Sequence, residues 1–152
     1  MRVLLVEDHN NTRTVLARLL THSGYEVHVA ADFASALVVL DQFHFDLLIS
    51  DIGLPDRTGF QLVAEVKKRQ PLKAVAITAW SSESHRLTGL ESGFDHYFTK
   101  PFDFAGLREV LAEIGCEPES RISRSIRNFC RRFTSGFKKL YRNKNDRTPL
   151  LD

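Results

Sequence analysis

Cysteine is scarce in this chain of 152 residues, and the two that occur are Cys116 and Cys130. They show none of the spacings typical of metal ligands, and no second pair accompanies them. We therefore expect reduced thiols, as in a cytoplasmic protein, and neither a disulfide framework nor a cysteine metal site.

Long apolar runs are also missing. No stretch approaches the roughly 20 apolar residues that a membrane-spanning helix needs. Met1 leads almost directly into Val3-Leu4-Leu5-Val6, and an acidic pair follows where a signal peptide has small residues before its cleavage site. The sequence thus predicts a cytoplasmic protein without a targeting segment.

The net charge of +2 hides an uneven distribution. Residues 1–116 hold 11 Lys/Arg and 15 Asp/Glu, a balance of −4, whereas residues 117–152 hold 10 and 4, a balance of +6. This split predicts one domain over residues 1–116 and a basic tail over residues 117–152.

Short apolar runs alternate with helical periodicity along residues 1–116. The runs that predict strands are 3–6, 26–30, 47–50, 74–78 and 96–99. Ser23-Gly24 marks the end of the first intervening helix. The later helices are expected to begin at Asp32, at Asp56 or Thr58, after the serine-rich stretch 81–84, and at Asp103. This alternation predicts an α/β fold, a doubly wound five-stranded parallel sheet with helices on both faces.

The run Leu47–Ser50 ends in Asp51, and a turn containing Gly53 and Pro55 follows. A carboxylate at the end of a buried strand is costly unless a partner offsets its lost hydration. The alternative is that Asp51 caps the next helix.

Further polar side chains follow the other strands. They are Glu7, Asp8, Thr78 and Lys100. Parallel strands bring their carboxyl ends to one edge of the sheet, which is where such folds bind ligands. We therefore expect these four residues to lie around Asp51.

Three carboxylates in one place repel each other unless a cation is present. Mg²⁺ fits, because it accepts one or two carboxylates and fills its other positions with water and phosphate oxygens. Lys100 adds a fixed positive charge and Thr78 adds a hydroxyl donor. This set suits phosphoryl transfer, with Asp51 as the nucleophile that forms an acyl phosphate.

Four motifs in this order resemble those of receiver domains of two-component response regulators. They are Val6-Glu7-Asp8, Asp51-Ile52-Gly53-Leu54-Pro55, Thr78-Ala79 and Lys100-Pro101-Phe102. The resemblance covers about residues 1–115, and residues 93–101 are similar to receivers of hybrid sensor histidine kinases. It implies a flavodoxin-like strand order 2-1-3-4-5 and a cis Lys100-Pro101 bond.

The resemblance also implies roles for single residues. Asp51 would accept a phosphoryl group from a sensor histidine kinase or a histidine phosphotransfer protein. Mg²⁺ would be bound by Glu7, Asp8, Asp51 and the carbonyl of Gly53. Lys100 would pair with the phosphoryl oxygens, Thr78 would move towards them, and Tyr97 would turn inward behind it. The face made by the fourth helix, fifth strand and fifth helix would then change and signal to a partner. Such a protein is no enzyme beyond its own phosphorylation and dephosphorylation.

Three alternatives remain. A Mg-dependent phosphatase of the haloacid-dehalogenase type also uses an Asp nucleophile, but it needs a second Asp where this chain has Gly53. A flavodoxin would place a flavin phosphate at the loop after the first strand, which is acidic here. A degenerate receiver would lack part of the five-residue set. The histidines His9, His28, His44 and His96 show no ligand spacing and are interpreted as surface or core residues.

Two positions near the predicted site are distinctive. Gly53 has no side chain to orient an attacking water, and Trp80 is bulky enough to cover the phosphoryl group. Together they predict slow self-dephosphorylation.

The tail carries a second pattern. Apolar residues at helical spacing over 122–141, with Lys and Arg on the opposite side, predict a basic amphipathic helix, and residues 143–152 are expected to be disordered. We expect the apolar side to dock on the receiver or on a partner protein. An anionic membrane surface is the next choice, and nucleic acid is disfavoured.

Overall fold

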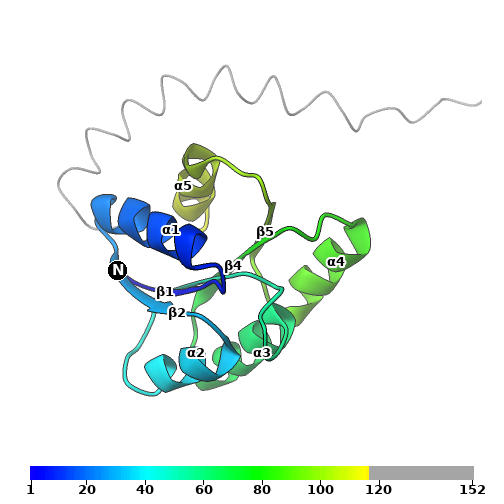
Figure 1. The fold of residues 1–152 in the computed structure, drawn as a ribbon, viewed down its shortest axis with the longest axis horizontal. Coiled ribbons are helices and arrows are strands. Elements are labelled where there is room, and N and C mark those ends of the chain that lie inside the picture. The colour runs from blue at the N-terminus through cyan, green and yellow to red at the C-terminus, as the bar shows by residue number, and fades with distance from the viewer. Residues whose placement is uncertain (117–152) are drawn as a thin grey trace, which may run out of the picture. The chain divides into compact units, whose positions relative to one another are not determined.

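The computed structural model describes residues 1–116, in which five strands and five helices alternate (Figure 1). The strands are β1 (Arg2–Val6), β2 (Glu26–Ala30), β3 (Leu47–Ser50), β4 (Lys73–Thr78) and β5 (His96–Thr99). The helices are α1 (Asn10–His22), α2 (Phe33–Leu40), α3 (Gly59–Arg69), α4 (Glu83–Ser92) and α5 (Phe104–Glu113). The predicted alternation is confirmed. The expected amphipathic helix over 122–141 lies outside the described residues.

All strand pairs are parallel, and their order is β2-β1-β3-β4-β5, as predicted. Helices α1 and α5 lie on one face of the sheet, and α2, α3 and α4 lie on the other (Figure 1). The register pairs Val6 with Ser50, and Ser50 with Ala76. Because β1, β3 and β4 are aligned in this way, the residues that follow them emerge at one edge.

The core has two layers because the central strands are covered on both faces. Leu4 and Leu48 point towards α2 and α3, whereas Leu5 and Ile49 point towards α1 and α5. All four side chains are buried. In contrast, the edge strand β2 leaves Val29 exposed.

Local hydrogen bonds set the helix starts. Thr58 forms a capping box with Gln61 at the start of α3, so Thr58, not Asp56, begins that helix. The carboxylate of Asp56 instead accepts the backbone N–H groups of Phe33 and Ala34 at the start of α2, both at 2.9 Å. The loop between β3 and α3 is thereby tied to the neighbouring helix.

Helix α1 differs from the other helices in its start. Its N-cap residue, His9, makes no side-chain cap hydrogen bond. Of the apolar residues at helical spacing, Leu16 and Leu20 are buried, but Val15 and Leu19 face outward.

Among the described residues no helix has both the length and the apolar character that crossing a membrane requires.

Candidate functional site

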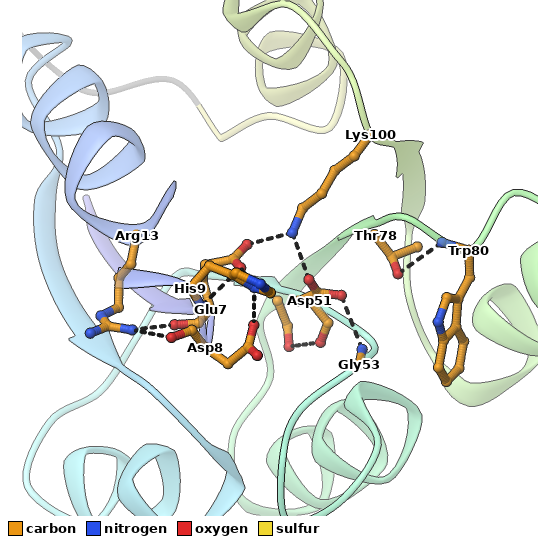
Figure 2. A network of polar contacts seen from close by, with 10 residues as sticks. Glu7, Asp8, His9, Arg13, Asp51, Gly53, Thr78, Trp80 and Lys100 are labelled. Atoms are coloured by element: carbon orange, nitrogen blue, oxygen red, sulfur yellow. Dashed lines mark hydrogen bonds and ion pairs between the residues drawn. The ribbon is translucent and has the colours of Figure 1, made fainter. Parts of the chain in front are cut away.

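Lys100 joins two buried carboxylates at the carboxyl edge of the sheet (Figure 2). Its Nζ lies 2.6 Å from Oδ2 of Asp51 and 2.7 Å from Oε2 of Glu7. The side chains of Glu7 and Asp51 are only 2% and 9% exposed, whereas that of Lys100 is 23% exposed. The partner that the buried Asp51 requires is therefore Lys100.

These contacts act on the lysine in turn. Burial lowers the pKa of Lys100, but the hydrogen bonds and negative charges of Asp51 and Glu7 outweigh burial. The net pKa of the ammonium lies above the ordinary value for lysine. Lys100 is thus a permanent positive charge at this edge across the physiological pH range.

The second oxygen of Asp51, Oδ1, accepts the backbone N–H of Gly53 at 3.0 Å. Asp51 does not cap α3, since Thr58 does, and so the capping alternative is wrong. The start of α3 nevertheless approaches Asp51 closely. A Cβ on Gly59 would overlap the Asp51 carbonyl oxygen and stand 2.8 Å from Cα of Ile52. Only glycine fits there without displacing the end of β3.

The loop after β1 places Glu7, Asp8 and His9 together, with one potential ligand atom from each within 4.8 Å of the others. Nδ1 of His9 lies 2.8 Å from Oδ1 of Asp8. Burial raises the pKa of Asp8, but the hydrogen bond and charge of His9 outweigh it, and the net pKa of this carboxyl lies below its ordinary value. Spacing had not indicated His9, although its place directly after the acidic pair was visible in the sequence.

No pattern in the sequence indicated a role for Arg13 at this edge of the sheet. Its Nη1 donates to the carbonyl oxygens of Glu7 and Asp8, at 2.6 and 3.1 Å. This contact ties the first turn of α1 to the acidic loop (Figure 2). It depends on how α1 leaves the sheet, which no local pattern in the sequence indicates.

The residues present fit a magnesium ion. Carboxylate oxygens of Glu7, Asp8 and Asp51 and the backbone carbonyl of Gly53 are hard oxygen donors of the kind that Mg²⁺ takes. The lysine already neutralises part of the charge of Glu7 and Asp51. Asp8, by contrast, is partly exposed, and its ion pair is with the exposed side chain of His9.

Thr78 ends β4 and is buried, with 1% of its surface exposed. Its Oγ1 accepts the backbone N–H of Trp80 at 3.3 Å. Trp80 is 37% exposed, and its ring centroid lies 6.2 Å from that of Phe60 and 4.8 Å from that of His85. Three elements, α3, the β4–α4 loop and α4, thus contribute an aromatic group beside the site.

The indole of Trp80 and the carboxylate of Asp51 lie on either side of the position where Gly53 lacks a side chain. A Cβ built on Gly53 would lie 3.9 Å from both Oδ1 of Asp51 and Cζ2 of Trp80. The absent side chain at position 53 therefore leaves open the space between the carboxylate and the indole (Figure 2).

Tyr97 lies on the edge strand β5 and is partly buried. Its hydroxyl donates to the backbone carbonyl of Trp80 at 2.8 Å. Burial raises the pKa of this phenol, and the charge of Asp51 adds to the increase. The peptide bond between Lys100 and Pro101 is cis, as the resemblance implied.

A parallel sheet in the order 2-1-3-4-5, with acids after β1 and β3 and a lysine after β5, is the arrangement expected of a receiver domain. Residues 3–112 match the family described as response regulator receiver domain. The chain belongs to this family. That membership places it among signalling proteins and not among the phosphatases that were the main alternative.

Two proteins with similar sequences illustrate the relationship. An uncharacterized 14.6 kDa protein of Leptolyngbya boryana is 39% identical over 106 residues, which are 68% of this chain and 81% of that protein. The sensory transduction protein RegX3 of Mycobacterium tuberculosis is 35% identical over 112 residues, which are 74% of this chain and 48% of RegX3. The chain spans about half the length of RegX3.

Solved structures show the same fold. The CheY-like receiver domain protein of Methanospirillum hungatei has a TM-score of 0.70 and 31% identity, over 74% of this chain and 90% of that one. The chemotaxis protein CheY4 of Vibrio cholerae has a TM-score of 0.70 and 30% identity, over 74% and 96%.

Proposed function

We propose that this protein is a phosphorylation switch in which Asp51 accepts a phosphoryl group. The donor would be a phosphohistidine of a sensor histidine kinase or a histidine phosphotransfer protein. One carboxylate oxygen of Asp51 attacks phosphorus, the P–N bond breaks, and the histidine nitrogen leaves. The observation that carries the proposal is the bridge from Lys100 to Asp51 and Glu7 at the carboxyl edge of the sheet.

Each neighbouring side chain has a task in this reaction. Lys100 already lies 2.6 Å from Asp51 and is placed to pair with the phosphoryl oxygens. Glu7, Asp8, Asp51 and the Gly53 carbonyl would hold Mg²⁺, which would supply charge neutralisation at the transferred group. The hydroxyl of Thr78 would turn from the Trp80 N–H to a phosphoryl oxygen.

Phosphorylation adds about −1.5 to −2 charges and three acceptor oxygens at the sheet edge. Movement of Thr78 and Tyr97 would then alter the face formed by α4, β5 and α5, where a partner would bind. The shift in population can be no larger than the difference in interaction free energy between the two states.

The phosphorylated form should be long-lived. Gly53 offers no side chain to orient a water, and the Trp80 indole stands within van der Waals reach of the space beside Asp51. Decay within seconds in the absence of a phosphatase would contradict this part of the proposal.

The test is to treat the full chain with a small phosphodonor such as acetyl phosphate in the presence of Mg²⁺ and to measure intact mass. We expect one added phosphoryl group on the wild type and none on Asp51→Asn. Asp56→Asn is the matched control, because Asp56 follows the same strand but contacts only backbone N–H groups of α2 and its own loop. It should be labelled like the wild type.

Two results would reject the proposal. One is a wild type that gains no mass with Mg²⁺ present. The other is equal labelling of Asp51→Asn and the wild type, which would place the phosphoryl group elsewhere. Removal of Mg²⁺ with a chelator should stop labelling, and labelling that is unaffected would reject the role of the acidic residues as ligands.

A further inference from the structure

Gly89 lies in the C-terminal half of α4 and is the one buried residue of that helix. Glycine inside a helix costs stability relative to alanine, because it loses more backbone freedom on folding. A Cβ at this position would lie 2.9 and 3.1 Å from Cδ2 and Cε2 of Tyr97. The missing side chain therefore makes the space that the tyrosine ring occupies.

The ring is held on its other side by a hydrogen bond. The Tyr97 hydroxyl donates to the carbonyl oxygen of Trp80 at 2.8 Å. Moving the ring by the few tenths of an ångström or more that a Cβ demands would displace a hydroxyl that is already at a good hydrogen-bond distance. The contact with Gly89 and the bond to Trp80 are thus coupled through one rigid aromatic ring.

Trp80 links this ring to the phosphorylation site. Its N–H donates to Thr78 and its indole lies beside Gly53, next to Asp51. The carbonyl that accepts the Tyr97 hydroxyl and the indole beside Asp51 both belong to Trp80. A change in the position of the carbonyl therefore also moves the indole. Contacts therefore run from α4 through Tyr97 and Trp80 to Thr78, and the Trp80 indole faces the open space beside the proposed phosphoacceptor.

We propose that Gly89 is a positioning residue of this switch, whose missing side chain admits the Tyr97 ring against α4 and thereby holds Trp80 at the phosphorylation site. The proposal rests on the proposed function for its meaning in signalling, but its structural core is independent of phosphorylation. A methyl group at position 89 shifts the protein towards a state in which the Tyr97 ring has moved away from α4 and Trp80 is more mobile.

The first test is a double-mutant cycle in the full chain, measured by urea unfolding without phosphodonor. Gly106→Ala in α5 is the matched control, since a Cβ there meets Asp103 only at an ordinary 3.5 Å. It should lower the unfolding equilibrium constant about two- to five-fold, the usual gain for alanine over glycine in a helix. Gly89→Ala should raise that constant in the wild type and lower it about two- to five-fold once Tyr97→Ala has removed the ring.

The second test follows Trp80, the single tryptophan of the chain, by acrylamide quenching of its fluorescence. The Stern–Volmer constant of Gly89→Ala should rise to that of Tyr97→Ala, while Gly106→Ala stays at the wild-type value. A purely structural helix defect would not change the quenching of a residue outside α4 in this selective way.

The outcomes separate cleanly. Stabilisation by Gly89→Ala in the wild type, or an equal effect with and without the Tyr97 ring, would overturn the proposal. Unchanged quenching would overturn it too, because Trp80 would then be independent of position 89. Neither measurement involves a phosphodonor, so failure of Asp51 to be phosphorylated would reject the proposed function and leave this result standing.

Discussion

Removing the lysine that bridges the two acids is the most direct test of how the site is held together. Lys100→Met keeps the length and apolar stem of the side chain but takes away its charge. Oε2 of Glu7 and Oδ2 of Asp51 would then lose an ammonium that now lies 2.7 and 2.6 Å away. Both carboxylates would remain buried without their cation.

The size of the effect follows from burial. Breaking a buried ion pair by removing one partner costs about 3–5 kcal/mol, because the other charge stays in the interior. Glu7 and Asp51 are 2% and 9% exposed, but Lys100 is 23% exposed, so water screens part of the interaction. We therefore expect Lys100→Met to lose about 2–4 kcal/mol of unfolding free energy at neutral pH.

Urea unfolding followed by circular dichroism measures this loss. Lys68→Met is the matched control, because Nζ of Lys68 lies 3.8 Å from Glu65 with its side chain 74% exposed. That variant should stay within about 0.5 kcal/mol of the wild type. Mg²⁺ should stabilise Lys100→Met more than the wild type, since the lysine no longer competes for the same oxygens.

A loss below about 1 kcal/mol would refute the reasoning, because that is the range of a solvent-exposed pair. Equal losses for Lys100→Met and Lys68→Met would do the same. A large loss that Mg²⁺ does not reduce would leave the ion bridge intact as an explanation but would contradict shared use of the carboxylates by the lysine and the metal.

Two further predictions concern the packing beneath the site and pH. Gly59→Ala should lose about 2–3 kcal/mol in thermal unfolding and also label poorly, because its Cβ overlaps the Asp51 carbonyl oxygen; wild-type stability would contradict this. Burial raises the pKa of Asp95, but hydrogen bonds from Lys67 and the Ala74 N–H outweigh it and leave the pKa lowered. Its stabilisation is therefore complete above the ordinary aspartate pKa and is lost as pH falls through the lowered value. Asp95→Asn should cost about 1 kcal/mol at pH 7, with a difference in urea midpoint that shrinks below about pH 4; a constant difference would refute the assignment.

The elements themselves were predictable because their signals are local. The strands predicted over residues 47–50 and 96–99 are confirmed residue for residue as β3 and β5. Asp32 and Asp103 do cap the helices that they were expected to begin. A short polar side chain before a helical pattern carries its own physical reason, namely an acceptor for N–H groups that the helix leaves unpaired.

Which polar groups meet was predictable only in part. Lys100 lies 49 residues from Asp51 and 93 from Glu7, and the sequence placed all three at one edge because parallel strands share a direction. The contact of His9 with Asp8 was missed because a single exposed histidine has no periodic signature. The contact of Arg13 with the loop carbonyls was missed because it depends on the path of α1, which no local pattern in the sequence indicates.

By itself, the sequence determined the alternation of strands and helices, the caps, and the set of residues that follow the strands, since each of these rests on neighbours within a few positions. Only the tertiary structure decided that Leu16 and not Val15 is buried, that Asp56 serves α2, and that Gly89 admits the ring of Tyr97. These outcomes depend on which surfaces close-packing brings together across the sheet, and a periodicity of 3.6 or 2 residues contains no information about the opposing surface.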